Sequence, residues 1–294
     1  MKYYAAIEAG GTKFVCAVFD EHRNLVAKQR IPTTSPTETL AEVVRFFNAQ
    51  IKKGFPVCSM GIASFGPLDL NPESPTFGYI TNTPKKGWSN IALLPQLQAA
   101  FSVPTQIDTD VNAAALAEYK WGAGQQLSPV IYVTVGTGIG AGVVINGQPL
   151  HGLVHPEIGH MKINTADVPA ACCPFHGSCL EGVASGPAMQ HIWQVSAETL
   201  PSEHAAWELE AKLLAQLCHN LMLSFSARKI ILGGGVMAHE GLISKIIHFT
   251  QISLAGYLTL PPQVQLSDII VATGLGENSG LLGAFALSLS KSAH

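Results

Sequence analysis

The segment that decides the fold lies at the start of the chain, where Glu8-Ala9-Gly10-Gly11-Thr12-Lys13 separates two β-prone runs. The runs are Tyr3–Ile7 and Phe14–Phe19, and two short strands joined by a glycine-rich turn predict a hairpin. Glycines let a backbone approach an anion closely and point its N–H groups at it, and a lysine adds a positive charge. The turn is therefore either an ordinary tight turn or a phosphate-binding loop made by Gly10, Gly11, Thr12 and Lys13.

The same pattern returns near the middle of the chain. Val130–Val135 is strongly β-prone, Gly136-Thr137-Gly138-Ile139-Gly140 follows it, and Ala141–Ile145 predicts a second strand. Two such hairpins favour nucleotide phosphates over coincidence, with Thr137 and Gly138 as the contacts in the second turn. We expect two similar α/β domains that place the two turns across one central cleft.

Composition limits the class of protein. With 294 residues, the chain is longer than a usual single core, so two domains are expected. Hydrophobic residues make up 47% and charged residues 13%, which excludes a disordered chain. The formal net charge of −3, without a basic run, argues against a role on nucleic acid or on a membrane surface. Glycine, proline or charge interrupts every apolar run and no signal peptide is recognised, so we expect a cytoplasmic protein.

Capping and turn residues predict the other main elements. Ser35-Pro36-Thr37-Glu38 predicts the start of a helix that ends at Gly54. Residues 67–90 are rich in proline, asparagine and glycine and predict a loop. Leucines in helical register predict a long helix over residues 203–227, and a glycine-punctuated segment predicts a last helix over residues 274–289.

Three of the six cysteines lie close together, which favours a metal site in a chain expected in a reducing compartment. Cys173-Pro174-Phe175-His176-Gly177-Ser178-Cys179 has the spacing C-x-x-H-x-x-C, and His160 upstream supplies a fourth ligand. Two thiolates and two imidazoles suit Zn²⁺, and four protein ligands leave no open position, so the zinc would be structural. Cys172 is the alternative to Cys173 as a ligand, although the even spacing favours Cys173.

Three carboxylates are candidates for the chemistry of the site. Asp110 precedes the helical run Ala113–Trp121, where either Asp110 or Asn112 caps the helix, or Asp110 acts as a general base toward an attacking hydroxyl. Glu157 lies shortly before His160, and Glu181 lies just after the cysteine motif. A metal site would hold both glutamates rigidly and suit them to accept hydrogen bonds from sugar hydroxyls; otherwise they are solvated loop acids.

Glycines after a buried strand give one more candidate. Ile230–Leu232 predicts a strand, and Gly233, Gly234 and Gly235 follow it. Such glycines either admit a flat base or a ribose, or they let neighbouring helices pack closely. Gly234 and Gly235 are therefore candidate nucleotide-binding residues.

Taken in order, these motifs resemble those of the ROK family (repressor, open reading frame, kinase) of the actin/hexokinase-like superfamily, and within it those of bacterial fructokinases. The matching segments span essentially the whole chain and are Glu8–Thr12, Asp110–Ala115, Gly136–Gly142, His155–His160, Cys173–Glu181 and Leu232–Val236. Glu8 stands where many members have Asp, Thr109 where many have Asn, and the zinc motif differs from the commoner C-x-C-G-x-x-G-C. The changes at Glu8 and in the zinc motif are familiar in the fructokinase-like branch.

The resemblance implies an α/β, two-domain actin/hexokinase-like (ribonuclease H-like) fold with a central cleft and a structural zinc loop. Residues 1–112 plus 283–294 would form a small N-terminal domain, and residues 113–282 a larger domain. The implied reaction is the ATP-dependent phosphorylation of a hexose primary hydroxyl, in the first place D-fructose to fructose 6-phosphate. ATP, Mg²⁺ and structural Zn²⁺ are the implied cofactors, and a homodimer is the implied assembly, without nucleic acid or membrane.

The resemblance also assigns roles to the candidate residues. Asp110 is the catalytic base, and Glu8 lies near the Mg²⁺ and the phosphates. The expected sugar contacts are Asn112, Glu157, His160 and Glu181. The expected zinc ligands are His160, Cys173, His176 and Cys179.

Other functions remain open at this stage. The chain is alternatively a kinase for mannose, glucose or an N-acetyl amino sugar, or a non-catalytic sugar-sensing protein with a kinase fold. We do not expect a DNA-binding repressor, because the family's repressors carry a helix-turn-helix segment ahead of the first hairpin, which begins here at Tyr3.

Overall fold

The computed structural model describes residues 1–290 and divides into two compact units. Unit 1 comprises Met1–Ala117, Pro149–His155 and the described residues from Asn278 onward. Unit 2 comprises Glu118–Gln148 and Pro156–Glu277. The predicted terminal segment of the small domain, 283–294, includes residues 291–294, which lie outside the described residues.

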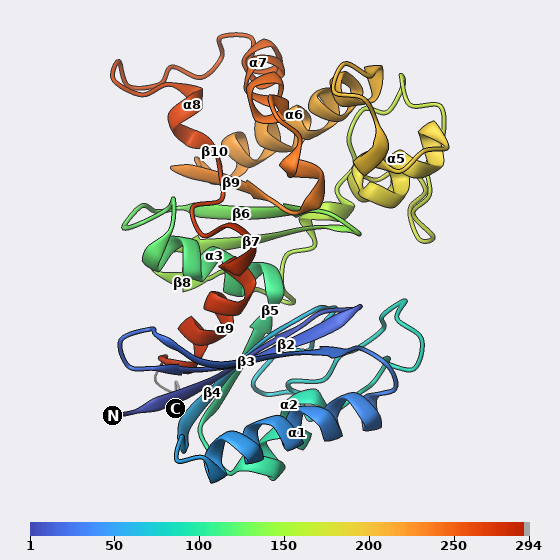
Figure 1. The fold of residues 1–294 in the computed structure, drawn as a ribbon. Helices are drawn as coiled ribbons and strands as arrows, with labels where there is room; N and C mark the ends of the chain where they lie inside the picture. Colours follow the sequence, from blue (N-terminus) through green and yellow to red (C-terminus); the bar gives the residue numbers. More distant parts are fainter. Residues whose placement is uncertain (291–294) are drawn as a thin grey trace. The chain divides into compact units, whose positions relative to one another are not determined.

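Unit 1 contains a five-stranded mixed sheet with helices on both faces (Figure 1). Its elements are β1 (Tyr3–Ala9), β2 (Lys13–Asp20), β3 (Leu25–Pro32), α1 (Pro36–Lys52), β4 (Val57–Ser64), α2 (Leu93–Phe101), β5 (Thr105–Thr109), α3 (Asp110–Trp121), whose last four residues belong to unit 2, and α9 (Ser279–Ser288). The strand order is β3-β2-β1-β4-β5. Strand β1 is antiparallel to β2 and parallel to β4, and β4 is parallel to β5. Helices α1 and α2 cover one face of the sheet, and α9 packs on the other.

The predicted helix after Ser35 is confirmed, and so are its signals. The Ser35 hydroxyl accepts a hydrogen bond from the Glu38 N–H at 3.4 Å, and a proline occupies the first turn. The helix ends at Lys52, and Gly54 follows with φ +92°, a conformation that favours glycine. The predicted loop over residues 67–90 is also confirmed, and it buries Trp88 completely against Phe14.

Two glycines allow α9 to lie directly on unit 1. A Cβ at Gly61 of β4 would lie 1.9 Å from the Ala284 carbonyl oxygen, and a Cβ at Gly283 would lie 2.3 Å from the Ala113 carbonyl. Any larger residue at either position must push backbone away from backbone. Helix α9 is therefore an integral part of the core of unit 1, although it comes from the end of the chain.

Unit 2 repeats the arrangement of a hairpin beside a parallel strand. Its elements are β6 (Val130–Val135), β7 (Ile139–Ile145), β8 (Gln148–Pro149), which ends at the first residue of the unit 1 segment 149–155, η1 (Ile158–His160), α4 (Leu180–Ala184), α5 (Gly186–Trp193), η2 (Ala197–Thr199), α6 (Ala205–Phe225), β9 (Lys229–Gly233), η3 (Gly235–Ala238), α7 (Leu242–Leu254), α8 (Leu266–Ile269), β10 (Ile270–Ala272) and η4 (Gly276–Asn278). The sheet order is β10-β9-β6-β7-β8. Strand β6 is antiparallel to β7 and parallel to β9, as β1 is to β2 and β4. Both predicted hairpins are therefore confirmed.

The last predicted helix is shorter than expected, because its first residues form a loop that is bound to the Glu118 side chain. Residues 274–278 are not α-helical, and α9 begins only at Ser279. The buried Glu118 carboxylate accepts hydrogen bonds from the Gly274 and Leu275 N–H groups, each at 3.1 Å, and from the Ala123 N–H at 2.8 Å. These bonds hold the segment as a loop.

Among the described residues, none of the helices combines the length and apolar character needed to cross a bilayer.

Candidate functional site

The first glycine turn, residues 10–13, is anchored from the segment that follows β3. The Gly10 N–H donates to the Lys13 carbonyl at 3.0 Å and closes the turn. Thr33 fixes it twice, because its hydroxyl donates to the Gly10 carbonyl at 2.7 Å and its N–H donates to the Thr12 carbonyl at 2.9 Å. Thr12 and Lys13 are exposed. The turn therefore presents a hydroxyl and an ammonium group on a fixed backbone, which suits an anionic ligand.

Glu8, at the end of β1, lies beneath this turn against α9. A Cβ at Gly280 would lie 2.5 Å from the Glu8 carboxylate. Burial raises the pKa of Glu8, although nearby positive charges oppose the shift. These charges belong to Lys13, Lys28 and Arg30.

The second glycine turn, residues 136–140, is anchored by a carboxylate. The Gly136 N–H donates to the Gly138 carbonyl at 2.9 Å, and the Glu181 Oε2 accepts a hydrogen bond from the Ile139 N–H at 2.9 Å. Gly138 makes room for that carboxylate, since a Cβ there would lie 2.7 Å from Oε2. Thr137 is exposed at the tip. Glu181, predicted as a sugar contact, thus also supports the turn.

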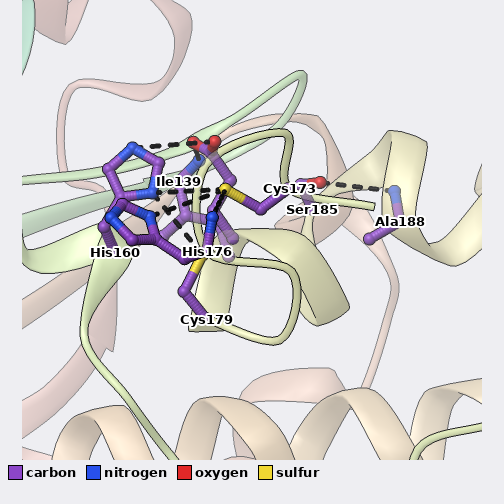
Figure 2. A network of polar contacts seen from close by, with 8 residues as sticks. Ile139, His160, Cys173, His176, Cys179, Ser185 and Ala188 are labelled. Atoms are coloured by element: carbon purple, nitrogen blue, oxygen red, sulfur yellow. Dashed lines mark hydrogen bonds and ion pairs between the residues drawn. The ribbon is translucent and has the colours of Figure 1, made fainter. Parts of the chain in front are cut away.

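Four predicted metal ligands lie together, as Figure 2 shows, and one of them, His160, lies beside the Glu181 carboxylate. One ligand atom from each of His160, Cys173, His176 and Cys179 lies within 4.8 Å of the others. His160 Nδ1 lies 3.5 Å from the Cys179 sulfur and 3.9 Å from the Cys173 sulfur, and His176 Nδ1 lies 3.6 Å from the Cys173 sulfur. Cys172 is exposed and is not part of the cluster.

The chemistry of this donor set fits zinc. In a tetrahedral zinc site with bonds of about 2.0–2.3 Å, ligand atoms lie roughly 3.3–3.8 Å apart, close to the spacing found here. Burial raises the pKa of the Cys179 thiol, and a bound cation would offset that by stabilising the thiolate. His160 Nε2 faces the Glu181 Oε1 at 3.9 Å, so a metal bound at His160 Nδ1 would orient Glu181 through the same ring.

Glu157 lies on the exposed side of the same region, directly before η1. Gly159 brings this 3₁₀ turn onto β7, because a Cβ there would lie 1.7 Å from the Ile139 carbonyl oxygen. The close approach explains how His160 and Glu181 reach the second turn from segments far apart in sequence.

A pocket of about 610 Å³ opens in unit 2 beside the second turn. It is lined by Gly136 and Thr137 of the turn, the start of α5, residues of the 196–200 segment, and Gly235 after β9. Trp207 and His239 form one wall, where their rings stack with centroids 3.8 Å apart. The Trp207 indole N–H donates to the Pro201 carbonyl at 3.0 Å, which fixes the ring.

Glycine is required where this pocket meets β9. Gly234 has φ +94°, and a Cβ there would lie 2.3 Å from the Val135 carbonyl oxygen. A Cβ at Gly235 would meet nothing within 4 Å, so its space is open to a ligand. The two ring nitrogens of His239 have no hydrogen-bond partner among the described residues. The predicted contacts Thr137 and Gly235 thus line one pocket.

The start of α3 brings together several side chains of unit 1. The Thr109 hydroxyl accepts a hydrogen bond from the Asn112 N–H at 3.1 Å, which is the capping pattern, so the cap is Thr109 rather than Asp110 or Asn112. Asp110 is the first residue of the helix, half-buried, and accepts a hydrogen bond from the Val111 N–H at 2.9 Å. Asp108, which precedes the cap, is buried and accepts from the Asn112 side-chain amide at 2.8 Å.

Sequence reasoning missed Asp108, His151, Trp207 and His239. Asp108 lies beside the predicted base and was within reach of the sequence argument. His151 lies 43 residues after Asp108 in the sequence and contacts it at 2.9 Å. The stacked rings of Trp207 and His239 also come from separate segments, since Trp207 lies in α6 and His239 follows η3. No local pattern signals contacts of this kind.

Comparison with known proteins identifies the family. The model of the ROK family matches residues 4–291. This chain belongs to the ROK family. The chain is 45% identical to the fructokinase of Zymomonas mobilis, over 98% of this chain and 97% of that one.

Two solved ROK structures share the fold. A ROK hexokinase from Thermus thermophilus superposes with a TM-score of 0.77 at 28% identity, and 97% of each chain is covered. A ROK glucokinase from Streptomyces griseus, solved in complex with glucose and AMPPNP, superposes with a TM-score of 0.72 at 25% identity, covering 97% of this chain and 99% of that one. The chain therefore has the ROK sugar-kinase fold, an α/β architecture with two mixed sheets.

Proposed function

We propose that this ROK protein is an ATP-dependent fructokinase, which transfers the γ-phosphoryl group of ATP to the primary hydroxyl of D-fructose to give fructose 6-phosphate. The full-length identity of 45% to a fructokinase carries this proposal, against 28% and 25% to the hexokinase and the glucokinase. The glycine turns and the metal-ligand cluster are consistent with it.

A panel of free sugars tests the substrate. Fructose, glucose, mannose, N-acetylglucosamine and N-acetylmannosamine would each be assayed with Mg-ATP, by coupling ADP release to NADH oxidation. Fructose is expected to give the highest kcat/KM. A higher value for another sugar would replace fructose as the substrate, and the absence of turnover with all of them would leave a sugar-sensing protein.

The pocket of unit 2 is the proposed adenosine site. Its volume of about 610 Å³ accommodates a nucleoside, and the stacked pair of Trp207 and His239 offers a flat apolar wall to a base. The open space at Gly235 admits a ribose. Gly234 supplies the backbone shape that exposes Gly235.

The two glycine turns are the proposed phosphate contacts. In unit 1 these are Gly10, Gly11, Thr12 and Lys13, and in unit 2 they are Thr137 and Gly138. Backbone N–H groups and the Lys13 ammonium would neutralise charge that develops during transfer. Mg²⁺ enters as part of the substrate Mg-ATP. Glu8 is the proposed residue that contacts this Mg²⁺ indirectly. Lys13, Lys28 and Arg30 oppose the effect of burial on Glu8, whose pKa is nevertheless raised.

Asp110 is the proposed general base. It would accept the proton of the sugar hydroxyl as the oxygen attacks the γ-phosphorus, and ADP leaves from the opposite side. The capping role that the sequence left open for Asp110 is filled by Thr109. Asp110→Asn is expected to lower kcat by about two to four orders of magnitude with little change in fructose affinity. Near wild-type turnover would exclude the assignment.

The proposed sugar contacts are Asn112, Glu157, His160 and Glu181. Zinc, bound by His160, Cys173, His176 and Cys179, would be structural, because all four positions are taken by protein atoms. It would hold the ring of His160 with Nε2 turned toward Glu181, so that Nε2–H and the carboxylate keep one orientation. We further propose that the protein is cytoplasmic and forms a homodimer. Light scattering of the purified protein tests the dimer.

A further inference from the structure

The segment Pro149–His155 belongs to unit 1 although the residues on either side of it belong to unit 2. Two histidines attach it. His151 Nε2 lies 2.9 Å from the Asp108 Oδ2, and His155 Nε2 accepts a hydrogen bond from the Leu68 N–H at 3.0 Å. The first of these contacts ends on the strand that leads directly into the proposed catalytic residue.

Asp108 joins this segment to the start of α3. Its Oδ1 accepts hydrogen bonds from the Thr109 N–H at 2.7 Å and from the Asn112 Nδ2 at 2.8 Å, and its Oδ2 faces His151. The carboxylate is buried, so its orientation is set by these partners and not by water. Asn112 and Thr109 flank Asp110 on both sides, and the backbone between them forms the first turn of α3.

We propose that His151 is a positioning residue for phosphoryl transfer, which acts through Asp108 to hold Asn112 and the first turn of α3, and with them Asp110, in the geometry that accepts the proton of the sugar. The inference rests on the proposed role of Asp110 as the base. His151 itself does not touch the transferred group.

Electrostatics supports this arrangement. A buried carboxylate such as that of Asp108 needs hydrogen bonds and a nearby positive charge. The hydrogen bond with Asp108 raises the pKa of His151, which favours the protonated, compensating form, while partial burial acts in the opposite direction. The negative charge of Asp108 also raises the pKa of His151.

The test separates the hydrogen bond from the side chain that makes it. His151→Ala removes the donor, whereas His151→Gln places an amide N–H near the former Nε2 position and keeps a donor to Asp108. The His151 side chain is 41% exposed, so its truncation is expected to leave the fold intact. His219→Ala serves as a matched control, because His219 makes a contact of the same length, 2.9 Å, with the Ser253 hydroxyl.

The readouts are kcat, KM for fructose, KM for Mg-ATP and the thermal midpoint Tm. His151→Ala is expected to lower kcat roughly 10- to 100-fold, as misplacement of a base does, with KM for Mg-ATP within about twofold. His151→Gln is expected to recover most of the lost kcat. His219→Ala is expected to keep the wild-type kcat.

Two results would overturn the proposal. One is a kcat of His151→Ala within about twofold of wild type, and the other is a loss in His151→Gln equal to that in His151→Ala. If the alanine variant does not fold, His151→Asn, whose shorter side chain falls short of Asp108, takes its place under the same criteria. Asp110→Asn in the same assay separates the two hypotheses, because an active Asp110→Asn refutes the base, whereas an inactive Asp110→Asn with an active His151→Ala refutes only the positioning role.

Discussion

The two glycine turns share a sequence pattern and a place at the tip of a hairpin, but the protein supports them differently. The turn at residues 10–13 is held by neutral hydrogen bonds from Thr33. The turn at residues 136–140 is held by a carboxylate, Glu181, which lies beside four metal-ligand side chains. Similar turn sequences are thus stabilised by different interactions. We expect the stability of the second turn to depend on the metal and that of the first turn not to.

Loss of the metal is expected to have the largest effect. Cys173→Ser replaces a thiolate ligand by a poor one, so the purified variant should lose its zinc and its Tm should fall by about 10 °C or more. Elemental analysis and thermal melts measure both. The neighbouring Cys172→Ser is the control and should keep zinc and Tm, because Cys172 lies outside the cluster. Equal zinc content in the two variants would contradict the assigned ligand set.

Alanine in the two turns should give unequal losses of stability. In Gly138→Ala the new Cβ would lie 2.7 Å from the Glu181 carboxylate and displace it from the Ile139 N–H. Loss of a hydrogen bond to a charged group costs about 1.5–3 kcal/mol, several degrees in Tm. Gly11→Ala meets nothing within 4 Å, so its Tm should change little. Similar Tm values for the two variants would contradict the inferred difference in how the two turns are supported.

The support of the first turn is testable at a single hydroxyl. Thr33→Val removes the 2.7 Å bond to the Gly10 carbonyl but keeps the shape of the side chain. Because the lost bond is neutral, the expected cost is about 1 kcal/mol, measured by urea unfolding. Thr34→Val is the control, since that exposed hydroxyl contacts Thr39, at 3.5 Å, and the Glu38 side chain rather than the first turn. A loss as large as that in Gly138→Ala would be inconsistent with neutral support.

The smallest effect concerns the acid below the first turn. Burial raises the pKa of Glu8 above its ordinary value of 4.5, so the folded state disfavours its ionisation. As the pH rises through 4.5 toward the raised pKa, the unfolded chain releases the proton first and folding loses stability. Glu8→Gln abolishes this term, so the Tm of the variant relative to wild type should increase between about pH 4 and pH 7. A difference that stays constant over this range would contradict the direction of the shift.

Much of the fold followed from local signals in the sequence. Ser35 and Gly54 marked the two ends of α1 because caps act within one helical turn, and both hairpins were recognisable because each joins two β-prone runs through a glycine-rich turn. The metal-ligand cluster was predictable for a similar reason, since Cys173, His176 and Cys179 are close in sequence.

Contacts between distant segments were not predictable in this way. Glu181 bonds Ile139 across 42 residues, His151 reaches Asp108 across 43, and Glu118 reaches Leu275 across 157. The last of these contacts also explains the shortened α9, because side-chain bonding to the backbone competes with the helix. A single sequence shows the local preference of a segment but not the partner that overrides it.

The packing of α9 on Gly61 has a consequence for biosynthesis. The ribosome delivers residues 1–117 first, with all five strands of their sheet, but the face on which α9 packs has no cover until Ser279–Ser288 has emerged. Nascent chains of this kinase must therefore keep one apolar sheet face uncovered while residues 118–278 are synthesised. We expect chains truncated before residue 279 to be captured by chaperones.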